Sequence, residues 1–138
     1  MQVLVVEDEL LVAEDTAALL KEAGHGVSGP ASTVEEAVKL AGEIGVDLAL
    51  VDINLCGSEV GPGLARDLWQ RFGVPCLFVT AQPARAREHQ DAAVGVLSKP
   101  FMASELLHSV PAARAAALGE EQRSWRPSNL ELFPPRRP

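Results

Sequence analysis

Five short apolar runs alternate along this chain with stretches whose apolar residues recur at helical spacing. Runs that are apolar at consecutive positions indicate strands buried on both faces, as in parallel sheets covered by helices. The pattern therefore predicts an α/β fold of five βα units joined by right-handed crossovers. The predicted strands are Gln2–Val6, His25–Gly29, Leu48–Val51, Pro75–Thr80 and Val94–Leu97.

Helix signals lie between and after these strands. Gly24 is a stop for the first helix, and Ser32 with Glu35 has the spacing of a capping box. Pro111 falls inside the last predicted helix, where it removes a backbone donor, so we expect a kink or break near residues 109–111. The predicted helices are Val12–Ala23, Ser32–Glu43, Gly61–Arg71, Ala84–Ala92 and Ser104–Leu118.

The length of 138 residues suits one domain with a sizeable core. We assign residues 1–118 to this domain and residues 119–138 to a tail that is rich in proline and charge and lacks periodicity. Such a segment is expected to be flexible or to order only on a partner. Because the chain ends there, no DNA-binding or enzymatic output domain is expected to follow.

Charge and hydropathy exclude several classes of protein. The formal net charge of −7 argues against non-specific binding to nucleic acid. No apolar run approaches the roughly 18 residues of a membrane span, and no signal peptide begins the chain. The expected location is cytoplasmic, with Cys56 and Cys76 as reduced thiols.

Chemically useful side chains stand where the predicted strands end. Glu7 and Asp8 follow the first strand, Asp52 follows the third, Thr80 ends the fourth, and Lys99 follows the fifth. In a parallel α/β sheet ligands bind outside the carboxyl ends of the strands. We therefore expect these residues to lie in one crevice.

Three carboxylates in one crevice repel one another and call for a cation. All-oxygen ligands of this kind suit Mg²⁺. The hydroxyl of Thr80 and the ammonium of Lys99 are donors that a transferred phosphoryl group would require. Asp52 is the natural nucleophile of such a site.

The order of these residues resembles the receiver domain of two-component response regulators, in its stand-alone, single-domain form. The resemblance covers about residues 1–118 and implies the flavodoxin-like doubly wound fold with a central five-stranded parallel sheet in the order 2-1-3-4-5. The residues that carry it are VVEDE at 5–9, LVDINL at 50–55, FVTA at 78–81 and LSKPF at 97–101.

The resemblance implies that Asp52 accepts a phosphoryl group from a histidine kinase or a histidine phosphotransfer protein. Thr80 and Lys99 would then hold the phosphoryl oxygens. The chain would catalyse its own phosphorylation and dephosphorylation and turn over no external substrate. Its output would be a contact with a downstream protein, or it would act as a sink for phosphoryl groups.

The resemblance also implies the ligands of Mg²⁺. Asp8 and Asp52 would bind the metal through their carboxylates and Asn54 through its backbone carbonyl. Glu7 would hold metal-bound water.

One position departs from the family pattern. Receivers usually carry Tyr or Phe three residues before the lysine that follows the fifth strand, which is Lys99 here. Rotation of that aromatic ring reports the state of the threonine at the end of the fourth strand. In this chain the position is Val96. Switching is therefore expected to use the loop after Thr80 or the following helix. A homodimer through the face made by the fourth helix, fifth strand and fifth helix is a further expectation.

Two alternatives remain open from the sequence. The chain could be a receiver-like binding module that works without phosphorylation, which Val96 and the tail favour. It could also be a small phosphohydrolase with an Asp nucleophile. Those enzymes need a general acid two residues after the nucleophile, and Asn54 occupies that place.

Overall fold

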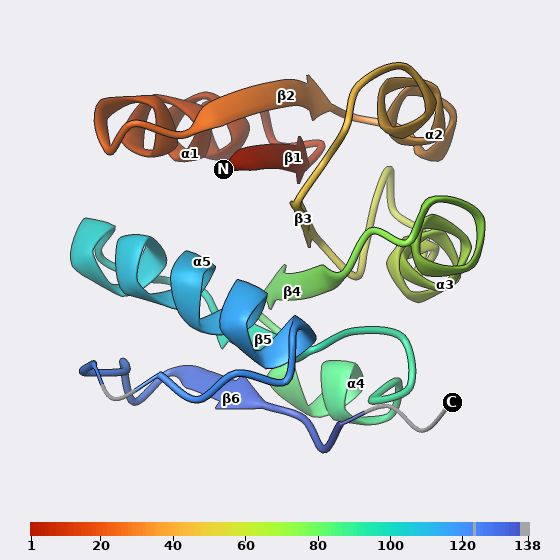
Figure 1. Cartoon of the computed structure of the whole chain (residues 1–138). Coiled ribbons are helices and arrows are strands. Elements are labelled where there is room, and N and C mark those ends of the chain that lie inside the picture. The colour runs from red at the N-terminus through yellow and green to blue at the C-terminus, as the bar shows by residue number, and fades with distance from the viewer. Residues whose placement is uncertain (123, 136–138) are drawn as a thin grey trace.

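A six-stranded sheet runs through the middle of the molecule in the computed structural model, which describes residues 1–122 and 124–135 (Figure 1). The strand order is β2-β1-β3-β4-β5-β6. Neighbours among the first five strands are parallel, which confirms the predicted fold class and the order 2-1-3-4-5. The strands are β1 (Gln2–Val6), β2 (Gly26–Ala31), β3 (Leu48–Val51), β4 (Cys76–Thr80), β5 (Gly95–Ser98) and β6 (Leu130–Leu132).

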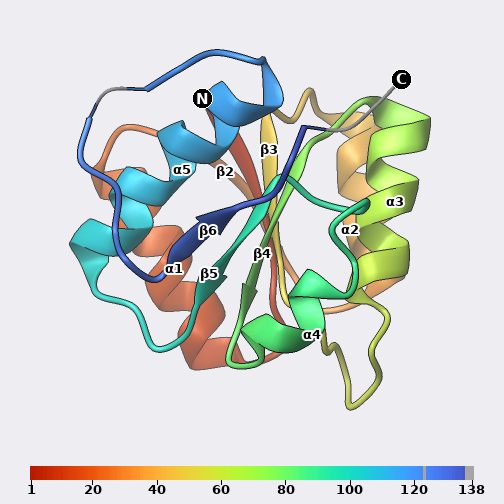
Figure 2. The same ribbon diagram turned by 90° about the horizontal axis from the view of Figure 1, so that it is seen from below.

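Helices cover both faces of the sheet, as the apolar character of the central strands requires. One face carries α1 (Leu10–Glu22) and α5 (Ala103–Ala117). The other face carries α2 (Val34–Glu43), α3 (Gly61–Phe72) and the short α4 (Pro83–Arg87) (Figure 2). Every residue of β3 and β4 is buried, so these strands form the centre of the core.

The sixth strand is a correction to the predicted five-stranded sheet. Residues 130–132 pair antiparallel with β5 and so lie within the segment expected to be a tail without regular structure. The strand adds to β5 because β5 would otherwise be an edge with unpaired backbone groups. Residue 123 and residues 136–138 of the same predicted tail lie outside the described residues.

Several element boundaries also differ from the predictions. Helix α4 has five residues and ends at Arg87, well before Ala92. The cap of α2 is Thr33, whose hydroxyl accepts from the backbone N–H of Glu36 at 3.2 Å, one residue later than the predicted Ser32 box. Helix α5 continues from Ala103 to Ala117 with Pro111 inside, so it does not break there.

Among the described residues, no helix has both the length and the apolar character needed to cross a membrane.

Candidate functional site

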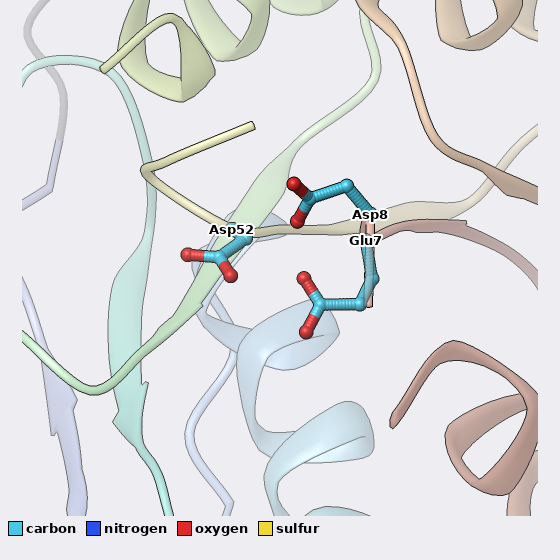
Figure 3. A group of neighbouring side chains, drawn as sticks. All are labelled: Glu7, Asp8 and Asp52. Atoms are coloured by element: carbon cyan, nitrogen blue, oxygen red, sulfur yellow. The ribbon is translucent and has the colours of Figure 1, made fainter. Parts of the chain in front are cut away.

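The predicted site residues do meet at the carboxyl edge of the sheet. Glu7 and Asp8 follow β1, and Asp52 follows β3, the strand that pairs directly with β1. One oxygen of each of these three carboxylates lies within 4.8 Å of the others. Figure 3 shows the side chains of Glu7 and Asp8 extending toward the region of Asp52.

Lys99 joins two of these carboxylates. Its Nζ lies 2.5 Å from Oε1 of Glu7 and 3.0 Å from Oδ2 of Asp52. The side chains of Lys99 and Asp52 are 17% and 13% exposed, so the ion pairs are largely screened from solvent. Lys99 reaches this position because its backbone N–H donates to the carbonyl of Thr80, 2.8 Å away on the neighbouring strand.

The surroundings of the buried Glu7 side chain disfavour its charged form. Burial, followed by the neighbouring Asp52, raises the pKa of Glu7 from 4.5 to about 7, although Lys99 opposes the shift. Burial lowers the pKa of Lys99, but hydrogen bonds to Glu7 and Asp52 outweigh it and the net pKa is raised. The ammonium of Lys99 therefore stays charged while Glu7 lies at the edge of protonation near neutral pH.

A tight turn after β3 fixes Asp8. Leu55 and Ser58 form an antiparallel bridge, with Cys56 between them at a φ of 52°. This turn directs the backbone N–H of Cys56 at Oδ2 of Asp8, 2.7 Å away. The sequence did not reveal this contact, because it depends on a left-handed conformation at a residue other than glycine.

Asn54 and Thr80 lie in a small network at the mouth of the site. The backbone N–H of Asn54 donates to Oδ1 of Asp52 at 3.3 Å, and its side-chain amide donates to Oε1 of Gln82 at 3.1 Å. The backbone N–H of Gln82 donates to Oγ1 of Thr80, a residue that is 1% exposed. The loops after β3 and β4 are thus tied together beside Asp52.

The donor set fits a magnesium ion. The carboxylate oxygens of Glu7, Asp8 and Asp52 are hard ligands close together, and Oε2 of Glu7 is buried without a hydrogen-bond partner among the described residues. A buried carboxylate oxygen left in this way favours a cation or a metal-bound water as its missing partner.

A family model of the response regulator receiver domain matches residues 3–111, which is most of the chain. The chain belongs to the response regulator receiver family. Receivers are signalling modules of two-component phosphorelay systems, and they bind Mg²⁺ through an acidic pocket such as the one formed here by Glu7, Asp8 and Asp52.

Two curated bacterial relatives show how this receiver compares in sequence. It is 41% identical over 103 residues to the phyllosphere-induced regulator PhyR of Methylorubrum extorquens, covering 72% of this chain and 38% of the relative. It is 31% identical over 115 residues to the transcriptional regulatory protein PdtaR of Mycobacterium tuberculosis, covering 81% and 56%. The receiver thus spans between about two fifths and somewhat over half of these relatives.

A solved structure extends the similarity to the whole fold. The signal receiver domain of a modulated diguanylate cyclase from Desulfovibrio desulfuricans is 34% identical to this receiver, with a TM-score of 0.73. The match covers 87% of this chain and 98% of that domain.

Proposed function

We propose that this receiver accepts a phosphoryl group on Asp52 from a histidine kinase or a histidine phosphotransfer protein. The observation that supports this most strongly is the setting of the Asp52 carboxylate. It is largely buried, accepts from the N–H of Asn54, and lies 3.0 Å from the ammonium of Lys99. A carboxylate held in this way is already oriented before the donor arrives, which lowers the entropic cost of the reaction.

In the proposed reaction an oxygen of Asp52 attacks the phosphorus of a phosphohistidine. The new bond joins that oxygen to phosphorus, and the phosphorus–nitrogen bond breaks as the imidazole of the donor leaves with the electron pair. The product is an acyl phosphate. Thr80 ends β4 and Lys99 follows β5, the next two strands of the sheet beyond β3, and both would donate to the phosphoryl oxygens, where negative charge accumulates.

Mg²⁺ completes the proposed site. Asp8 and Asp52 would bind it through carboxylates and Asn54 through its backbone carbonyl, while Glu7 would hold metal-bound water. When bound, the ion supplies positive charge that offsets the carboxylates and the phosphoryl oxygens.

The proposed output is a contact with a downstream protein, or the removal of phosphoryl groups from a kinase. We propose no turnover of free phosphate esters, because Asn54 is an amide at the place where an aspartate-nucleophile phosphohydrolase needs an acid. The only hydrolysis in this proposal is that of the acyl phosphate itself. The hydrogen-bonded side-chain amides of Asn54 and Gln82 lie next to it.

Intact mass after incubation with acetyl phosphate and Mg²⁺ tests the proposal. We expect the gain of one phosphoryl group, which Asp52→Asn and chelation by EDTA each abolish. Asp67→Asn is the matched control, because Asp67 pairs with Arg71 on the surface of α3. Phosphorylation of Asp52→Asn at the parent rate would refute the proposal, and the phosphorylation-independent binding module would replace it.

A further inference from the structure

The strand β6 lies against β5, the strand that leads into Lys99. Its register pairs Leu130 with Leu97, Glu131 with Val96, and Leu132 with Gly95. Phe133 follows it, donates its backbone N–H to the carbonyl of Val94 at 2.8 Å, and is only 7% exposed. The chain therefore covers its own sheet edge with a strand and an aromatic anchor.

Phe133 and Val96 are both buried, at 7% and 1% exposed. Both residues belong to one buried cluster that also contains Phe78 of β4 and Ala86 of α4. Docking of β6 therefore contributes to the packing between β5 and α4.

Asn129 connects β6 to the site through Ser98. The backbone N–H of Ser98 donates to the carbonyl of Asn129 at 3.0 Å, and the side-chain amide of Asn129 donates to the carbonyl of Ser98 at 3.2 Å. Ser98 precedes Lys99 and pairs with Thr80 on β4. Asn129 thus restrains the backbone of Ser98, which is next to Lys99 in the chain and beside Thr80 in the sheet. Lys99 and Thr80 are the two residues proposed to contact a phosphoryl group.

A second connection runs through α4. Glu131 accepts from Nε of Arg87, the last residue of α4, at 2.8 Å. The other end of α4 begins after Gln82, whose N–H donates to the hydroxyl oxygen of Thr80 at 3.0 Å. Helix α4 is therefore linked to β6 through Arg87 at one end and to the Thr80 hydroxyl through Gln82 at the other.

We propose that docking of β6 and filling of the Asp52 site oppose one another, so that β6 is a self-bound cover released by phosphorylation. This inference rests on the proposed function. An anionic group on Asp52 draws the hydroxyl of Thr80 and the ammonium of Lys99 toward itself. Both movements act on the segments that Asn129 and Glu131 hold, and each is therefore less favourable while β6 is docked.

Coupling between two sites is reciprocal, so it can be measured from either side. From the first side, hydrogen exchange of the backbone amides of residues 130–133 is followed in the full chain with and without Mg²⁺ and beryllofluoride, an analogue of the phosphoryl group. We expect exchange there to be about fivefold or more faster with beryllofluoride. The amides of β2, at the opposite edge of the sheet, are the internal control and should change little.

From the second side, the affinity for beryllofluoride is compared between variants of the full chain by calorimetry. Asn129→Ala and Glu131→Gln should each bind beryllofluoride more tightly than the parent. The double variant that carries both substitutions should bind it about fivefold more tightly. Glu121→Gln is the matched control, because Glu121 is exposed and lies outside β6. These substitutions leave Phe133 in place, so the variants retain the buried anchor.

Unchanged or slower exchange of residues 130–133 on binding would overturn the inference. So would equal or weaker affinity in variants whose β6 amides exchange faster than those of the parent. The proposed function is judged separately by Mg²⁺-dependent uptake of a phosphoryl group from acetyl phosphate. Uptake of a phosphoryl group without coupling to β6 would refute only the proposed release of β6. Absence of both phosphoryl uptake and beryllofluoride binding would refute the proposed function as well.

Discussion

Lys99 is the side chain on which the electrostatics of the site depend most. It neutralises part of the charge of Glu7 and Asp52, and its donors face the place where a phosphoryl group would be carried. In a site this poor in solvent, a fixed positive charge stabilises developing negative charge far better than water does.

Substituting Lys99→Met should therefore slow phosphorylation of Asp52 by acetyl phosphate by about 10²-fold or more. Lys39→Met, at an exposed position on α2, should react at the parent rate. A time course of intact mass at fixed Mg²⁺ measures both rates. A Lys99→Met rate within a factor of two of the parent would show that the ammonium has no part in the reaction.

Glu7 gives the fold a characteristic pH dependence. Its pKa is raised from 4.5 to about 7, so the folded state binds more protons than the unfolded state between these values. The free energy of unfolding should therefore fall as pH rises from about 4.5 through 7, by up to the order of 3 kcal/mol.

Glu7→Gln should remove this decline, because the amide has no proton to lose. Urea unfolding in EDTA at several pH values measures it, with Glu9→Gln, at an exposed position after β1, as the control that keeps the parent's slope. A parent-like decline in Glu7→Gln would assign the titration to another group.

The first residue of helix α3, Gly61, packs so closely against the backbone after β3 that no side chain fits there. A Cβ on Gly61 would lie 2.1 Å from the carbonyl oxygen of Asp52 and 2.7 Å from Cα of Ile53, both backbone atoms that cannot turn aside. Among the described residues, none outside its chain neighbours and its own helix backbone comes within 4 Å of a Cβ built on Gly63, two residues later in the same helix. The absence of a side chain at residue 61 is thus what lets α3 pack behind the phosphoacceptor.

Gly61→Ala should lower the free energy of unfolding by about 1–3 kcal/mol and slow phosphorylation of Asp52, whose backbone it displaces. Gly63→Ala should raise stability by about 0.5–1 kcal/mol, since alanine restricts the unfolded chain and favours helix. Denaturant unfolding of the two variants gives both signs. Equal effects in the two variants would mean that the helix relaxes away from Asp52 without cost.

Elements whose signals are long and periodic were predictable, and those that depend on a few residues were not. The parallel strands followed from consecutive apolar positions such as Leu48–Val51, whereas their order followed from the resemblance to receiver domains. The strand Leu130–Leu132 was missed because three residues between prolines carry too little periodicity. Its only signal was the alternation of Leu130, Glu131 and Leu132, with Phe133 behind them.

The molecule as a whole explains why the site itself was predictable. Parallel topology brings the carboxyl ends of β1, β3, β4 and β5 to one edge, so residues at those ends meet wherever the sheet forms. Contacts made by loops, such as Cys56 with Asp8 and Asn54 with Gln82, depend on local turn conformations that no strand pattern specifies.

The same topology bears on self-association. The face predicted to form a homodimer includes β5, and β6 already pairs with the edge of that strand. Residues 130–132 of the same chain therefore occupy the backbone edge of β5 and border the face predicted to form the dimer.

Trapping the phosphorylated residue is the most direct measurement of what this receiver does. After incubation with acetyl phosphate and Mg²⁺, borohydride reduces an aspartyl phosphate to homoserine, and peptide mass spectrometry then identifies the modified position. We expect homoserine at position 52 and at no other aspartate. Homoserine at Asp8 or elsewhere, or a phosphoryl group retained on a serine, threonine or histidine, would contradict the assignment of Asp52 as the phosphoacceptor.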